Sequence, residues 1–176
     1  MVNITIAQDL QSDSVWTVNI GDKKLYLNMP YDVFCREFAE YIYKSYKNTH
    51  DNVSRIMVVL QIPDATIYGQ EAKLTVFFVN HNSNHSEEHK IYKIAIEVIA
   101  NDIRIESPYT GIKRYQQQVQ QMTQEIAASA AAQFGEPTSF HTNMGYELFG
   151  YTKNGVVFGG SIDRDNFFYH LWLIKE

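Results

Sequence analysis

Cysteine, proline and runs of positive charge are all scarce in this sequence. Its 176 residues include one cysteine, Cys35, and four prolines. A single cysteine excludes an intrachain disulfide and fits a reducing compartment. Acidic residues outnumber basic ones by 20 to 15, the net charge is -5, and no Lys/Arg run exceeds two residues. The chain therefore lacks the basic footprint that is typical of proteins that bind nucleic acid or anionic membranes.

Long apolar runs are absent as well. A membrane helix needs about 20 consecutive apolar residues, and no run in the chain approaches that length. The N-terminal residues after Met1 lack the basic and apolar regions of a signal peptide. No linker or shift in composition divides the chain. We therefore expect one domain spanning residues 1–176 and a cytoplasmic location.

The common catalytic and cofactor motifs are missing. The chain has no Gly-x-Ser-x-Gly elbow, no His-Glu-x-x-His motif, no Walker-type phosphate loop and no paired Cys-x-x-Cys. Cys35 lies beside Phe34 on the apolar side of a predicted helix, which indicates a buried, inert thiol. We expect no cofactor and favour a non-enzyme, although an active site assembled from distant residues leaves no local motif.

Aromatic and β-branched residues are abundant, and they favour strands. The chain has 12 Tyr and 10 Phe. Asn154-Gly155, between the strand-like residues 146–152 and 156–162, is the strongest hairpin signal, because a type I′ turn needs positive φ at both central positions. Gly21-Asp22 and Asn101-Asp102 mark two further hairpins. The pattern predicts about seven to ten strands in a mainly antiparallel sheet.

Two stretches show helical periodicity. Apolar residues recur every three or four positions from Gly111 to Phe134, and Gly135 and Pro137 then end the pattern. A shorter amphipathic pattern predicts a helix from Tyr31 to about Tyr46. The prediction is an α+β fold, in which two helices pack against an antiparallel sheet.

Three histidines, His81, His85 and His89, are spaced four residues apart. On a helix this spacing would place three imidazoles on one side, as in a zinc site. The Asn- and Ser-rich sequence between them is typical of a loop between strands, so these histidines are weak metal candidates.

Candidate partner-binding residues lie near the C-terminus. Asp163, Arg164 and Asp165 form a charged turn, and loops on a rigid scaffold often carry binding residues. Tyr146 and Tyr151 are further candidates, because tyrosine is enriched at interfaces. Tyrosine is also a common strand residue, so packing in the core is the alternative for both.

Two functions follow from this profile. The first is a non-catalytic protein that binds a protein partner. Because the chain is acidic, a basic partner would be complementary in charge. Small, acidic proteins without catalytic motifs include bacterial immunity proteins, secretion chaperones and phage-encoded inhibitors, and they suggest this function by analogy of type only. The alternative is a small-molecule binder or enzyme with a pocket between the sheet and residues 111–134, which could include His141 or His170. Strand edges leave self-association open.

Overall fold

The computed structural model describes residues 1–8, 16–82, 88–99, 108–143, 145–163 and 168–175, and for residues 108–115, 163 and 168 it describes the backbone alone. The elements in chain order are β1 (Val2–Gln8), β2 (Trp16–Ile20), β3 (Lys23–Tyr26), α1 (Tyr31–Glu37), a 3-10 turn η1 (Ala39–Tyr41), β4 (Ile42–His50), β5 (Val53–Leu60), β6 (Ala65–Ile67), β7 (Gln70–Asn80), β8 (Lys90–Ile99), α2 (Pro108–Phe134), β9 (Ser139–Asn143), β10 (Tyr146–Lys153), β11 (Val156–Asp163) and β12 (Phe168–Lys175). The predicted α+β class, with a mainly antiparallel sheet and two α-helices, is confirmed.

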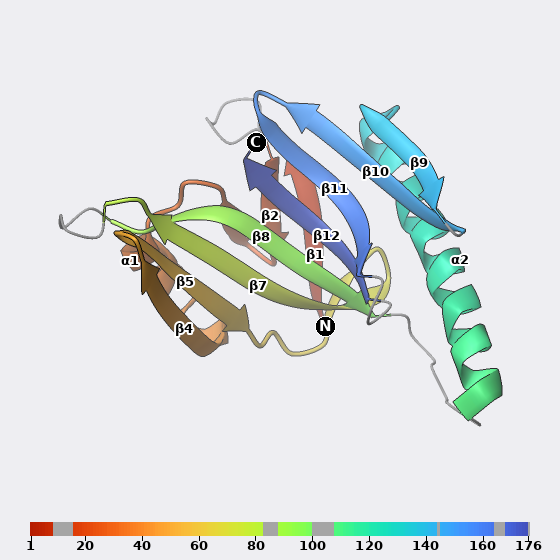
Figure 1. Cartoon of the computed structure of the whole chain (residues 1–176), viewed down its shortest axis with the longest axis horizontal. Helices are drawn as coiled ribbons and strands as arrows, with labels where there is room; N and C mark the ends of the chain where they lie inside the picture. The colour runs from red at the N-terminus through yellow and green to blue at the C-terminus, as the bar shows by residue number, and fades with distance from the viewer. Residues whose placement is uncertain (9–15, 83–87, 100–107, 144, 164–167, 176) are drawn as a thin grey trace.

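Eight strands form what we call the main sheet, in the order β4-β5-β7-β8-β12-β11-β10-β9, with every pair antiparallel. Behind it lies a smaller rear sheet of β3, β2 and β1, which β6 links to β7 (Figure 1). The Asn154-Gly155 hairpin is confirmed, with φ of 51° and 71° at its two turn residues. The predicted hairpin at Asn101-Asp102 lies outside the described residues.

The core fills the space between the two sheets. Buried residues alternate along β5, β7 and β8, so one face of each of these strands points inward. An aromatic cluster joins the layers: Trp16 of the rear sheet lies 5.4 Å from Phe158 of β11 and 5.0 Å from Phe134 of α2, measured between ring centroids. The rear sheet and α2 therefore pack on the same face of the main sheet.

Helix α2 confirms the helix predicted from residue 111 onward. Among its described side chains, those of Val119, Met122, Thr123, Ile126 and Ala130 are buried, and the helix packs mainly on β10. Gly135 ends it at φ 82°, with its N–H bonded to the carbonyl of Ala131. In the described part of the chain, neither helix is long and apolar enough to cross a membrane.

The helix predicted from Tyr31 to about Tyr46 is wrong beyond Glu37. The chain leaves α1 there, makes η1, and from Ile42 runs as β4, which pairs with β5 from Val53 to Leu60. A full strand partner outweighs weak helical periodicity in this segment, which is rich in β-branched and aromatic residues. The predicted helix face is consequently split between the core, where Phe34 and Phe38 are buried, and an exposed edge strand that carries Tyr46.

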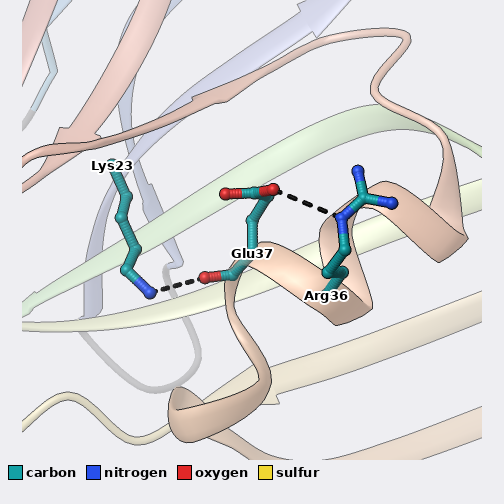
Figure 2. Close-up of polar contacts among 3 residues, drawn as sticks. All are labelled: Lys23, Arg36 and Glu37. Atoms are coloured by element: carbon teal, nitrogen blue, oxygen red, sulfur yellow. Dashed lines mark hydrogen bonds and ion pairs between the residues drawn. The ribbon is translucent and has the colours of Figure 1, made fainter.

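Lys23 holds the end of α1. Its Nζ donates a 2.6 Å hydrogen bond to the Glu37 carbonyl oxygen, while Arg36 Nε lies 3.4 Å from the Glu37 carboxylate (Figure 2). The same Nζ pairs with Glu40 at 2.8 Å. A lysine at the last carbonyls of a helix satisfies a group that has no partner within the helix. This contact fixes α1 against β3.

The other face of the main sheet, which we call the open face, points away from the rear sheet and both helices (Figure 1). No described helix or strand covers it. Several of its aliphatic and aromatic side chains are partly or largely exposed instead of buried: Tyr46, Met57, Val59, Phe77, Val79, Ile99, Trp172 and Ile174.

Candidate functional site

The described ones among the three histidines that were weak metal candidates do not form a ligand cluster. His81 follows β7 in an exposed position, and His85 lies outside the described residues. His89 instead forms a 2.8 Å hydrogen bond through Nε2 with the buried Ser54 Oγ. Among the described residues, no group of three His, Cys, Asp or Glu side chains has the arrangement of a metal site. The structure therefore offers no support for this weak candidate within the described chain.

The predicted partner-binding residues are spread over different environments. Tyr146 and Tyr151 of β10 are core residues, with only 5% and 6% of their surface exposed. Asp163 ends β11, its side chain is not described, and Arg164 and Asp165 lie outside the described residues. A binding role for all five stays a prediction, and the burial of the two tyrosines does not favour it.

The open face has a charge pattern of its own. Five of its described side chains are basic and two are acidic: Lys44, Arg55, Lys73, Lys90 and Lys93 against Glu71 and Glu97. The whole chain, by contrast, has a net charge of -5. Positive charge is therefore concentrated around the aliphatic and aromatic centre of this face.

Trp172 lies at the centre of the open face, where glycine makes room for it. A Cβ on Gly159, its cross-strand neighbour, would stand 3.3 Å from the Trp172 ring and 2.7 Å from the Phe149 carbonyl oxygen. The indole Nε1 donates a 3.0 Å hydrogen bond to Ser161 Oγ. The ring is thus fixed against the sheet with its polar atom satisfied, and it presents a flat apolar surface.

A hollow, which we call the helix groove, lies between α2 and strands β9 and β10. It has a volume of about 370 Å³ and is lined by Gln124, Ala127, Ala128, Ala131, Glu136, Pro137, Phe140, Glu147, Phe149 and Tyr151. Small side chains on the helix side leave it open, and aromatic rings form the sheet side. Phe140 is 54% exposed at its rim.

Glu147 is the unusual residue of the helix groove. Its Oε2 is buried and has no hydrogen-bond partner among the described residues, whereas its backbone N–H donates to Thr123 Oγ1 at 3.0 Å and its carbonyl accepts from Tyr169 Oη at 3.3 Å. Nearby, burial raises the pKa of Tyr151, whose hydroxyl donates to the Gly135 carbonyl at 2.9 Å. The backbone of Glu147 is thus held firmly while one carboxylate oxygen stays unpaired.

A larger hollow of about 1030 Å³ lies at one end of the main sheet, lined by Met1, Tyr43 and residues 59–62, 64–66 and 71–73. Its described lining contains no buried side-chain polar atom without a partner. Its charged lining residues Asp64, Glu71 and Lys73 are exposed, whereas a ligand site holds a few polar groups in fixed positions, so the helix groove is the better candidate of the two.

Comparison of this chain with protein-family models, with curated proteins and with solved structures finds no match. The chemistry of the two surfaces is therefore the basis for any functional argument.

Sequence reasoning missed the open face, and it named a pocket between the sheet and residues 111–134 only as the alternative, without the residues that line the helix groove. The open face was visible in part, because the strands at residues 70–80 and 90–99 carry Phe77, Val79 and Ile99 on the side opposite the core, together with three lysines. The helix groove left no local signal, since α2 and β10 meet only in the folded chain. His141 and His170, suggested for such a pocket, do not line it.

Proposed function

We propose that the protein is a non-catalytic protein-binding domain, and that the open face of its main sheet binds an acidic surface of a protein partner. The observation that carries the proposal is the concentration of basic side chains around an aliphatic and aromatic centre that no described helix or strand covers, on a chain that is acidic as a whole. Occlusion of the partner's surface, as in an inhibitor, immunity protein or chaperone, is the expected mode of action.

The composition of the open face favours a protein partner. A well-packed interface has an apolar centre with aromatic anchors and a charged rim. Trp172 and Met57 supply the centre, and Arg55 and Lys73 belong to the rim. Complementary charge would steer an acidic partner to this face and raise the rate of association. A second copy of the chain, docking face to face, would bring like charges together.

The edge strand β4 extends this surface. It pairs only with β5 within the described sheet, and nearly all of its residues are exposed. Tyr43 and Tyr46 are 58% and 51% exposed, and Lys44 Nζ lies 5.1 Å from the centre of the Tyr43 ring. Lysines on an edge strand discourage pairing with other neutral or basic strands, which agrees with selection for an acidic partner.

Single-stranded nucleic acid is the competing occupant, since bases stack on exposed aromatic rings. On this sheet the rings are partly occupied: Lys93 Nζ lies 5.5 Å from the centre of the Phe77 ring, and Trp172 packs on Gly159. Aliphatic residues supply most of the remaining apolar surface. These features, with the net negative charge, support the protein partner.

The test compares two double variants that change net charge equally. Arg55→Glu with Lys73→Glu reverses charge on the open face, and Lys153→Glu with Lys175→Glu does so at exposed positions outside it. A partner would be captured from source-cell lysate, identified by mass spectrometry, and its affinity measured with purified proteins. We expect an acidic partner whose affinity falls at least about tenfold in the open-face variant and little in the control.

Equal loss of affinity in both double variants would contradict the proposal, because it would show only a long-range charge effect. Binding of a single-stranded oligonucleotide that depends on Arg55 and Lys73, without a protein partner, would also overturn it. The earlier expectation of a basic partner at Asp163 and its neighbours stays a prediction, as does the cytoplasmic location.

A second candidate function is the binding of a small molecule in the helix groove. The specific observation in its favour is a hollow of about 370 Å³ with a mainly apolar lining and one fixed polar atom that has no partner among the described residues. Ligand sites typically have volumes from about 300 Å³ upward and combine apolar walls with few orienting polar groups.

A further inference from the structure

The helix groove is both aromatic and negatively charged. Its described lining includes the rings of Phe140, Phe149 and Tyr151 and the carboxylates of Glu136 and Glu147, and contains no lysine, arginine or histidine. A site with this lining disfavours anions and offers two kinds of attraction to a cation: Coulombic attraction to carboxylates and attraction to the faces of aromatic rings.

The strand register explains why these groups meet. Glu147, Phe149 and Tyr151 are alternate residues of β10, so they share the face that points toward α2. Phe140 of β9 lies directly opposite Phe149. Ala127 and Ala128 stand across the gap on α2. The Glu147 carboxylate thus lies two residues along β10 from the Phe149–Phe140 pair. It faces alanine side chains of α2 that are too small to fill the space between helix and sheet.

The unpaired oxygen of Glu147 supplies the decisive observation. A buried carboxylate oxygen without a donor is costly, because burial removes water without replacing its hydrogen bonds. The described chain offers this Oε2 no donor, while it uses both backbone groups of Glu147 to hold the residue in place. Glu147 as a whole lines the groove and is only partly buried, so a rotation of its carboxylate would let a ligand with an N–H donor and a positive charge satisfy the oxygen.

We propose that the helix groove binds a small organic cation, an ammonium group on an apolar body, with Glu147 as its counter-ion. The ammonium group lies at the Glu147 carboxylate, and the apolar body packs between the rings of Phe140 and Phe149 and the alanines of α2. This inference rests on the second candidate function, small-molecule binding in the helix groove, and names its ligand class.

The test uses two probes of nearly equal shape and different charge, 2-phenylethylammonium and 2-phenylethanol. Each is titrated into the isotope-labelled full chain while NMR chemical shifts are followed for residues of α2, β9 and β10. We expect the ammonium compound to bind with a Kd below about 1 mM and the alcohol at least about tenfold more weakly, since a charge-assisted hydrogen bond is lost.

Three variants locate the interaction. Glu147→Gln keeps the shape of the side chain and removes its charge, so the two probes should then bind within about twofold of each other. Glu125→Gln is the matched control, because Glu125 is an exposed acid of α2 outside the groove. Ala128→Phe, at an exposed helix position that lines the groove, should fill the space and abolish binding of both probes.

The outcomes separate the inference from the function on which it rests. Equal binding of both probes to the groove of the wild-type protein overturns cation recognition and leaves a small-molecule site. A preference for the ammonium probe that survives Glu147→Gln overturns the role of Glu147. Absence of binding of either probe, or shifts unchanged by Ala128→Phe, overturns both the inference and the second candidate function.

Discussion

Gly160 shows at the scale of a single residue how closely the core is packed. A Cβ there would stand 2.7 Å from Tyr169 Cζ and 3.1 Å from Phe149 Cε1, and it would overlap Tyr169 Oη. Tyr169 is fully buried, burial raises its pKa, and its Oη donates to the Glu147 carbonyl. The missing side chain of Gly160 therefore makes room for the tyrosine that ties β12 to the backbone of Glu147.

We predict that Gly160→Ala lowers the free energy of unfolding by about 2 kcal/mol, because the added methyl group forces a buried ring to move. Tyr169→Phe alone should cost about 1 kcal/mol through its lost hydrogen bond. In the double variant the cost of the alanine should shrink, since the overlapping hydroxyl is gone. Urea unfolding of the four proteins measures this coupling. Strictly additive costs would show that the two residues do not compete for the same space.

Sequence predicted the strands of this fold better than its contacts. The Asn154-Gly155 turn was predictable because backbone conformation at two adjacent positions decides it. The end of α1 was not predictable, since it depends on the pairing of β4 with β5 and on a hydrogen bond from Lys23, which lies outside the helix in the sequence. The groove carboxylate Glu147 was hidden for the same reason: its unpaired oxygen exists only where α2 covers β10.

At the scale of elements, His89 helps to hold α1 and β5 against the start of β8. Its carbonyl accepts a 2.9 Å hydrogen bond from the Tyr31 N–H, and its ring contacts Ser54 Oγ. Burial, and then the charge of Lys47, lower the pKa of the His89 imidazole. The unfolded chain, with a pKa near 6.5, binds this proton more readily than the folded chain. Stability is therefore present above about pH 6.5 and lost as pH falls below it.

We predict that His89→Gln makes the protein less sensitive to acid. Between about pH 8 and pH 5 the wild-type protein should lose more unfolding free energy than the variant, because glutamine keeps a polar group near Ser54 and takes up no proton. Asp32 and Glu88, whose hydrogen bond lowers the pKa of Asp32 and raises that of Glu88, titrate in both proteins. His141→Gln, at an exposed histidine, is the control. Parallel stability profiles for wild type and His89→Gln would contradict the prediction.

At the scale of the whole molecule, one core joins the two sheets and α2. Phe158 of the main sheet contacts Trp16 of the rear sheet and Phe134 of α2, with ring centroids 5.4 and 5.9 Å apart. Strand β6 is also hydrogen-bonded to both β1 and β7. The apolar face of the three-stranded rear sheet is buried against the main sheet and α2, so we expect this sheet to be unstable by itself. The layers should consequently behave as one cooperative unit.

The two tryptophans of the chain make this prediction testable, because Trp16 reports from the rear sheet and Trp172 from the open face. In Trp172→Phe and in Trp16→Phe, each with one tryptophan left, the urea midpoint from fluorescence should coincide with that from far-UV circular dichroism. Adding Phe158→Leu, at the contact between layers, should lower both midpoints in each background. A fluorescence midpoint that departs from the circular dichroism midpoint in either variant would show that the layers unfold separately, and residues 1–176 would then not be a single domain.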